Sequence, residues 1–222
     1  MPTVIFDADS TIFSIETLDQ LSVPILKEDP EKLAKIHELT NLGMQGKIDF
    51  YESLSKRLEI LQLNKSQIKP FADKLHNYIT DGFADLVKNL NDLNIDLWVL
   101  SGGLLEVIQP VLLDLGFKAD KIHGSGMNWD QNGNYLSLSD KYPLNYSKVA
   151  ALKKSNWHKV WHKPRIMIGD GFTDLKLYQE NMVDEMIVYT EHAARENVIA
   201  SAPYRAHNIE ELKNILYKLL DI

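Results

Sequence analysis

The sequence predicts an α/β fold in which a doubly wound parallel sheet carries an inserted helical cap. Short apolar runs alternate with stretches whose apolar residues recur at helical spacing, and this alternation is typical of βαβ units. The apolar runs do not alternate with polar residues, so we expect strands that are buried on both faces. Residues 16–78 lack a convincing strand and are rich in Leu, Lys, Glu and Ile, which indicates a helical insertion.

The elements can be assigned in chain order. Val4-Ile5-Phe6 predicts the first strand, and Asn132-Gly133 is a turn signal that predicts a hairpin over residues 126–138. The remaining elements are a helix from Phe83 to Leu93, a strand at 96–100, a helix from Leu105 to Leu115, a helix from Lys148 to Lys154, strands at 165–168 and 186–189, and a helix from Ile209 to Leu219. We therefore expect a core at 1–15 and 79–222, which includes the hairpin, and a cap at 16–78.

Composition narrows the class of protein. The 222 residues are enough for one large domain or a core with an insert, and 45% hydrophobic with 25% charged residues is typical of soluble globular proteins. The net charge of -7 disfavours nonspecific nucleic-acid binding, and the absence of cysteine excludes disulfides and thiolate chemistry. No apolar run has membrane-spanning length, and the first core strand begins at once, so we expect no signal peptide. A cytoplasmic enzyme, either a monomer or a homodimer, is the expectation.

Polar groups follow three of the predicted strands and open one of the predicted helices. In a doubly wound sheet the carboxyl ends of the strands converge on one crevice, where ligands bind. Carboxylates there suit Mg²⁺, whereas a hydroxyl, a glycine amide and an ammonium suit a phosphoryl group. The groups are Asp7 with Asp9, Ser101 with Gly102, Lys148, and Asp170 with Asp174. Taken singly, Asp7 and Asp9 also fit a turn and a helix N-cap, and Ser101-Gly102-Gly103 also fits a tight turn.

These motifs together resemble the haloacid-dehalogenase superfamily of phosphotransferases, over essentially the whole chain. The matching segments are Asp7-Ala8-Asp9-Ser10-Thr11, Leu100-Ser101-Gly102-Gly103, Ser147-Lys148 and Gly169-Asp170-Gly171-Phe172-Thr173-Asp174. The resemblance implies a core of Rossmann-like topology and a Mg²⁺-dependent reaction on a small phosphorylated metabolite. It also implies an aspartyl-phosphate intermediate.

The same resemblance implies a role for each matching residue. Asp7 is the nucleophile, and Asp9 protonates the leaving alcohol and later activates water. Asp170, Asp7 and the backbone carbonyl of Asp9 hold Mg²⁺, and Asp174 supports them. Ser101, the Gly102 amide and Lys148 hold the phosphate. The chemistry agrees, because a carboxylate attacks phosphorus readily once cations neutralise the phosphoryl dianion, and an alkoxide leaving group needs a proton.

Residues of the expected cap resemble the phosphoserine phosphatase family. The match consists of Glu16 after the first motif, Gly43-Met44-Gln45-Gly46, Phe50, and Ser53-Leu54-Ser55-Lys56-Arg57-Leu58. It implies that Glu16 takes the substrate ammonium and that Arg57 takes its carboxylate, a task for which a guanidinium fork is suited. Met44 and Phe50 would form the apolar wall, and Thr173 would contact the substrate. The expected reaction is hydrolysis of O-phosphoserine, a step of serine biosynthesis.

Alternative interpretations remain open at this point. Glu16 also fits a first-turn helix acid, and Arg57 a solvated helix residue beside Lys56. Another small phosphomonoester, such as a phosphorylated amino alcohol or a phosphosugar, is the second choice of substrate, and a phospho-accepting signalling module is a third function.

Two features depart from the family pattern, and one further segment has no assigned role. Phe172 replaces a small residue, and Thr190-Glu191-His192 replaces a glycine-rich turn. We interpret the segment of Trp157, His158, Trp161 and His162 as surface or packing rather than a zinc site.

Overall fold

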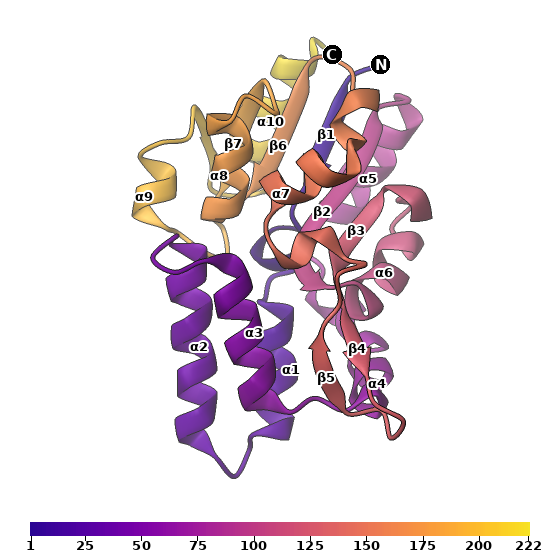
Figure 1. Ribbon diagram of the computed structural model, residues 1–222. Coiled ribbons are helices and arrows are strands. Elements are labelled where there is room, and N and C mark those ends of the chain that lie inside the picture. The colour runs from indigo at the N-terminus through magenta and orange to yellow at the C-terminus, as the bar shows by residue number, and fades with distance from the viewer.

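The computed structural model describes residues 1–222 and has a six-stranded parallel sheet at its centre (Figure 1). The strand order is β3-β2-β1-β6-β7-β8, so β1 lies between β2 and β6. The strands are β1 (Thr3–Phe6), β2 (Asp96–Leu104), β3 (Ile122–Ser125), β6 (Arg165–Gly169), β7 (Glu185–Tyr189) and β8 (Tyr204–Ala206). The predicted fold class is confirmed.

Helices cover both faces of this sheet. Val4 and Phe6 pack into the larger apolar core with α5, α6 and α10, whereas Ile5 between them packs into a smaller core with α7 and α8. Successive side chains of a strand point to opposite faces of the sheet. A strand that packs into an apolar core on each face therefore needs an unbroken run of apolar residues. The helices of the core are α5 (Phe83–Asp92), α6 (Leu105–Asp114), α7 (Lys148–Ser155), α8 (Phe172–Gln179), α9 (Glu196–Ile199) and α10 (Ile209–Leu220).

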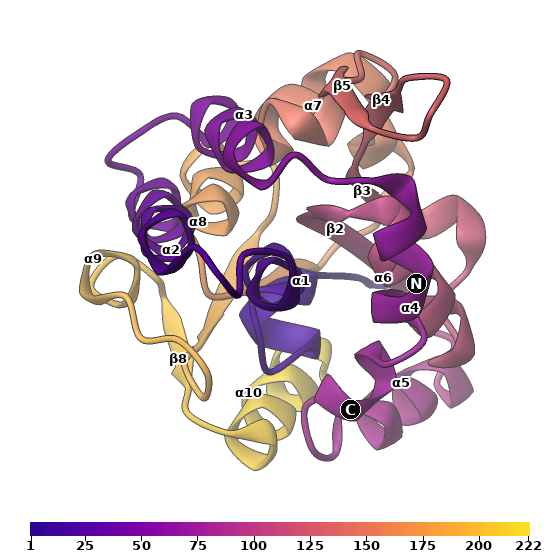
Figure 2. The same ribbon diagram turned by 90° about the horizontal axis from the view of Figure 1, so that it is seen from below.

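A bundle of three helices stands beyond the carboxyl ends of the strands, and we call it the cap (Figures 1 and 2). It consists of α1 (Thr17–Ile25), α2 (Pro30–Met44) and α3 (Phe50–Leu61). Aspartate side chains cap two of these helices: Asp29 accepts from the Lys32 amide and Asp49 from the Tyr51 amide. The next helix, α4 (Ile68–Ala72), packs against α6 of the core. The limits of the cap at 16 and 78 remain a prediction.

Some elements differ from the sequence-based expectation. The strands β3 and β8 were not predicted, and β2 continues to Leu104 instead of ending at Leu100. The register between β2 and β3 shifts after Leu100, where small residues follow. Between the strands of the hairpin, Gly133 has φ of 78°. The hairpin strands are β4 (Met127–Trp129) and β5 (Tyr135–Leu138), and short 3-10 turns span Lys65–Gln67, Leu75–Tyr78, Ala119–Lys121, Pro143–Asn145 and Trp157–Val160.

No helix combines the length and the apolar composition needed to cross a bilayer. Both termini lie at the end of the sheet opposite the cap (Figure 1). The space between the cap and the carboxyl ends of the strands is therefore the region where the candidate site residues should be sought.

Candidate active site

Asp7 stands at the carboxyl end of the central strand, where the chain turns sharply. The turn Ala8–Ile12 includes Ser10 in the left-handed region, with φ of 52°. Asp7 Oδ1 accepts a hydrogen bond from the Ala8 amide at 2.7 Å, and the residue is buried. The turn thus fixes one oxygen of the Asp7 carboxylate at the centre of the sheet edge.

Three buried carboxylates gather at this edge, as the sequence predicted. Asp7, Asp170 and Asp174 each place one oxygen within 4.8 Å of the others. The Gly171 amide donates to Asp174 Oδ2 at 3.0 Å, so the start of α8 orients that carboxylate. Burial raises the pKa of Asp174 to about 7, against the opposing effect of Lys148. Hard oxygen donors this close together fit a divalent cation.

Lys148 lies inside this acidic cluster. It is the first residue of α7, after the N-cap Ser147, whose side chain accepts from the Ala150 amide. Its ammonium is 3.0 Å from Asp7 Oδ1 and also contacts Asp174 Oδ1. Lys148 therefore pairs with two of the three carboxylates, Asp7 and Asp174, and partly offsets the negative charge of the cluster.

The Ser101–Gly103 segment of β2 offers donors on the other side of Asp7. Ser101 Oγ accepts from the Gly103 amide at 2.9 Å, so its hydroxyl hydrogen is available to a ligand. A Cβ atom on Gly102 would lie 2.6 Å from Cζ of Phe50. The glycine therefore allows the cap residue Phe50 to pack directly against this segment of β2.

Asp9 is buried, and only one of its two carboxyl oxygens has a hydrogen-bond partner. Its Oδ2 accepts from the Thr17 hydroxyl at 3.0 Å, and Oδ1 is buried without a hydrogen-bond partner. Burial raises the pKa of Asp9 well above its usual range, and the charges of Glu16 and Asp7 raise it further. These effects shift Asp9 toward its protonated form relative to an exposed aspartate.

Glu16 is bound by a residue that the sequence reasoning missed. Its Oε1 accepts from the Ser10 hydroxyl at 2.9 Å and from Arg195 Nη2 at 3.0 Å, while Oε2 is buried without a partner. Burial raises the pKa of Glu16, and Arg195 opposes the rise. Arg195 Nη1 also contacts Asp170. The sequence signal for Arg195 is its place beyond the carboxyl end of β7, where residues of a doubly wound sheet meet ligands.

Arg57 is buried in the cap rather than solvated. Only 4% of the residue is exposed. Nη1 donates to Thr40 Oγ1 at 2.9 Å and lies 3.6 Å from Asp19 Oδ1, and Nε donates to the Ser53 carbonyl at 3.4 Å. The interpretation of Arg57 as a surface residue is therefore wrong for this structure.

A small enclosed cavity joins the cap to the core. Its volume is about 10 Å³, roughly the space of one water molecule, so the cap is closed over it. The predicted residues that line it are Asp9, Glu16, Met44, Phe50, Arg57 and Gly102. Two carboxylates, each with one buried oxygen that has no hydrogen-bond partner, and one arginine thus line a single closed space.

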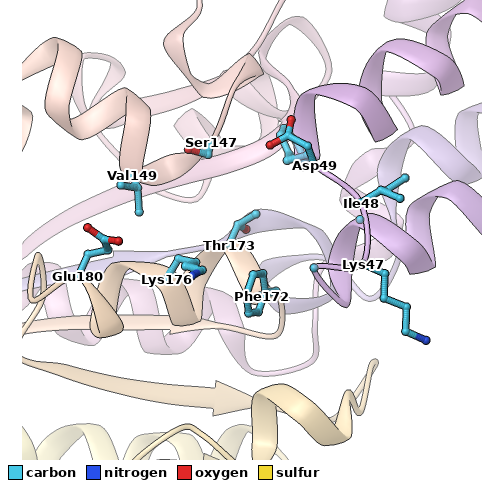
Figure 3. Close-up of a pocket in the computed structure, with 12 residues that line it drawn as sticks. Lys47, Ile48, Asp49, Ser147, Val149, Phe172, Thr173, Lys176 and Glu180 are labelled. Atoms are coloured by element: carbon cyan, nitrogen blue, oxygen red, sulfur yellow. The ribbon is translucent and has the colours of Figure 1, made fainter.

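A second cavity of about 410 Å³ lies between the α2–α3 loop and α8 (Figure 3). We call it the outer cavity, and we call the small enclosed one the inner cavity; Phe50 lines both. Phe172, Thr173 and Lys176 line it on the core side, and Lys47 and Asp49 on the cap side. Thr173 therefore lies in the outer cavity and does not line the inner one.

The chain is similar to several known proteins. The sequence model of the haloacid dehalogenase-like hydrolase family matches residues 1–177. The chloroplastic phosphoserine phosphatase of Arabidopsis thaliana is 31% identical over 215 residues, which cover 96% of this chain and 71% of that protein. The phosphoserine phosphatase of Homo sapiens is 29% identical over 177 residues, or 78% and 75% of the two chains.

Solved structures show the same likeness. A phosphoserine phosphohydrolase-like protein of Francisella tularensis superposes with a TM-score of 0.93 at 38% identity, over 97% of this chain and all of the other. A substrate-bound phosphoserine phosphatase superposes with a TM-score of 0.79 over 98% of each chain. At 19% identity, that second likeness concerns the fold alone.

Proposed function

Because the chain belongs to the haloacid dehalogenase-like hydrolases and is a phosphoric monoester hydrolase, we propose that it hydrolyses O-phosphoserine in a Mg²⁺-dependent reaction. The names of its relatives support this substrate, since phosphoserine phosphatases from a plant and an animal match it over most of its length.

The observation that carries the proposal is the chemistry of the inner cavity. Glu16 Oε2 is a buried acceptor without a partner, and it suits the substrate ammonium. Arg57 lines the same cavity and suits the carboxylate, because the guanidinium binds a carboxylate through charge-assisted hydrogen bonds. Asp9 Oδ1 is the second acceptor without a partner, and a protonated Asp9 suits the ester oxygen. O-phosphoserine carries all three complementary groups.

The proposed reaction has two steps. In the first, a carboxylate oxygen of Asp7 forms a bond to phosphorus while the bond from phosphorus to the serine oxygen breaks, and Asp9 gives that oxygen its proton. In the second, Asp9 takes a proton from a water molecule, which attacks phosphorus and releases phosphate from Asp7. The raised pKa of Asp9 suits this order, because it favours the protonated form that the first step needs.

The remaining residues hold the reacting groups. Asp7, Asp170 and the backbone carbonyl of Asp9 would hold Mg²⁺, with Asp174 supporting them, and the ion would neutralise charge on the phosphoryl group. Lys148 supplies a second positive charge beside Asp7.

Uncharged groups of both the core and the cap complete the proposed contacts to the substrate. Ser101 and the Gly102 amide donate to phosphate oxygens. Met44 and Phe50 exclude water from the apolar side of the inner cavity, and Thr173 contacts the substrate from the outer cavity.

A panel of phosphomonoesters, assayed with and without a chelator, tests the proposal. We expect O-phosphoserine to be preferred over phosphoethanolamine, which lacks the carboxylate, and over phosphosugars, which lack both the carboxylate and the ammonium. Turnover should cease in excess chelator and return when Mg²⁺ is added. Preference for a phosphosugar, or full activity in chelator, contradicts the proposal. Stoichiometric labelling without turnover would instead indicate a signalling module.

The variant Arg57→Ala tests the carboxylate contact. Charge-assisted hydrogen bonds contribute about 1.5–3 kcal/mol each, so kcat/KM for O-phosphoserine should fall by about 10- to 100-fold. Phosphoethanolamine should be nearly indifferent to the change. Lys56→Ala is the matched control, because Lys56 is the neighbouring cation of α3 but pairs with Glu52 at the surface. Equal losses on both substrates in Arg57→Ala would mean that Arg57 is structural.

A further inference from the structure

Three helices of the cap meet at the guanidinium of Arg57. Asp19 comes from α1, Thr40 from α2 and Arg57 from α3. Arg57 Nη1 donates to Thr40 Oγ1 at 2.9 Å, and the Thr40 hydroxyl lies 2.5 Å from Asp19 Oδ1, to which it donates. The same Asp19 oxygen is 3.6 Å from Arg57 Nη1. A chain of two hydrogen bonds and one ion pair thus crosses the cap.

This network is shielded from solvent. Thr40 is 2% exposed, and the side chains of Arg57 and Asp19 are 5% and 15% exposed. Burial raises the pKa of Asp19, while Arg57 and the hydrogen bond from Thr40 oppose the rise. A buried guanidinium without a partner is costly, so this pairing is what allows Arg57 to sit beneath the cap surface.

The network occupies only part of the Arg57 guanidinium. Its contacts with Ser53, Thr40 and Asp19 use Nε and Nη1, which leaves Nη2 for a ligand. An arginine side chain has several rotatable bonds, and fixing them in advance reduces the entropy lost on binding. The guanidinium of Arg57 is therefore held in one orientation before any substrate enters.

We propose that Thr40 and Asp19 are positioning residues that hold Arg57 for the carboxylate of the substrate and thereby set the preference for amino-acid phosphates. The inference rests on the proposed function, since it takes Arg57 as the carboxylate site. Neither residue lines the inner cavity, so both act through Arg57 rather than by touching the substrate.

Thr40→Val tests the inference, because valine keeps the shape of threonine and removes the hydroxyl. We expect kcat/KM for O-phosphoserine to fall about tenfold, mainly through KM, as part of a charge-assisted contact is lost. For phosphoethanolamine the change should stay within about twofold. Thr40→Ser restores the hydroxyl and should restore the parent kinetics. Asp19→Ala is a second variant and should show the same substrate pattern as Thr40→Val.

Two controls separate positioning from loosening of the cap. Ser53→Ala removes a buried hydroxyl of α3 that donates to the Leu39 carbonyl of α2, and it should leave the substrate preference unchanged. In an Arg57→Ala background, Thr40→Val should cause no further loss on O-phosphoserine, because the group it positions is gone. Additive losses in the double variant would overturn the inference, as would equal losses on both substrates.

The outcomes also distinguish this inference from the proposed function. A parent protein that does not hydrolyse O-phosphoserine overturns both. A parent that does hydrolyse it, loses activity in Arg57→Ala and keeps full kcat/KM in both Thr40→Val and Asp19→Ala overturns the inference alone. Thermal unfolding of each variant shows whether it is folded before kinetics are compared.

Discussion

Arg195 and Glu16 are 179 positions apart, yet Nη2 of the arginine lies 3.0 Å from Oε1 of the glutamate. The other terminal nitrogen of Arg195 contacts Asp170. One guanidinium therefore joins the proposed ammonium site to the proposed metal site. It comes from the loop after β7, and Asn197 in the same segment donates to the Gln45 carbonyl of the cap at 3.0 Å.

We predict that Arg195→Gln increases affinity for divalent cations. A positive charge beside Asp170 opposes the binding of another cation, and the opposition is strong in a buried site of low effective dielectric constant. Removing it should tighten Mn²⁺ binding by about five- to tenfold in the absence of substrate. Titration calorimetry or electron paramagnetic resonance of free Mn²⁺ measures the affinity directly, without reference to turnover.

Lys47→Gln is the control for Arg195→Gln. It makes the same change of charge at a residue of the outer cavity, which does not contact the acidic cluster. Mn²⁺ affinity should therefore be nearly unchanged. Equal shifts in the two variants would show a general effect of net charge, and no shift in Arg195→Gln would show that Arg195 does not compete with the metal.

We also predict that Asp7→Asn abolishes turnover while the protein stays folded. The amide oxygen preserves the shape of the side chain but is a poor nucleophile toward phosphorus. Asp85→Asn is the matched control, because Asp85 is exposed on α5. Loss of covalent phosphate from acid-quenched protein, with circular dichroism unchanged, is the expected result. If Asp7→Asn turned over substrate at nearly the parent rate, the aspartyl-phosphate route would be excluded.

Much of the site could be predicted because it depends on local patterns. Polar residues after buried strands identify Asp7 and Asp170, and chain order identifies Lys148. The sheet then brings them together, since β1 pairs with β6 in register from Thr3 to Phe6. A run of apolar residues was enough to place Asp7 at the carboxyl end of the first strand.

Other features depend on tertiary context and leave little trace in the sequence. The strand β3 is Ile122-His123-Gly124-Ser125, with one large apolar residue, and it forms because β2 offers an edge to pair with. Arg195 reaches Glu16 only through the path of a loop with no periodic pattern. The contact of Thr40 with Arg57 depends on how α2 packs against α3, which helical spacing does not determine.

Histidine at position 123 should make the folded protein less stable in acid. Its ring stacks on Trp157 with centroids 3.6 Å apart, and burial lowers its pKa to about 4. In the unfolded chain the imidazole of His123 takes up a proton near pH 6.5, whereas in the folded protein it does so only near pH 4. Stability is therefore lost as the pH falls through this interval.

The variant His123→Gln should flatten that dependence. Because the ring is only half-buried, we expect the loss of unfolding free energy between pH 7 and pH 5 to shrink by about 1 kcal/mol. Urea denaturation at the two values measures it. His162→Gln, at an exposed histidine, should leave the slope unchanged. An equal slope in the parent and in His123→Gln would contradict the assignment.

The contact between Phe172 and Gly46 gives a prediction about cap closure. A Cβ atom on Gly46 would lie 2.3 Å from Cδ1 of the Phe172 ring, and Gly46 has φ of 70°. The ring of α8 thus lies directly against the α2–α3 loop (Figure 3). Gly46→Ala should hold the loop away from α8 and lower kcat/KM at least tenfold, since a displaced cap exposes the inner cavity to water.

Paired variants separate the steric clash from backbone strain. Phe172→Ala makes room for the added methyl group, so Gly46→Ala combined with Phe172→Ala should recover part of the activity that Gly46→Ala loses. Gly116→Ala is the control for strain, because Gly116 has φ of 96° and only the Asn91 side chain nearby. It should lower the melting temperature and leave kcat/KM unchanged.

Limited proteolysis between residues 44 and 50 should be faster in Gly46→Ala than in the double variant. Equal cleavage rates and no recovery of activity would mean that the strained glycine, and not the phenyl ring, controls how the cap closes.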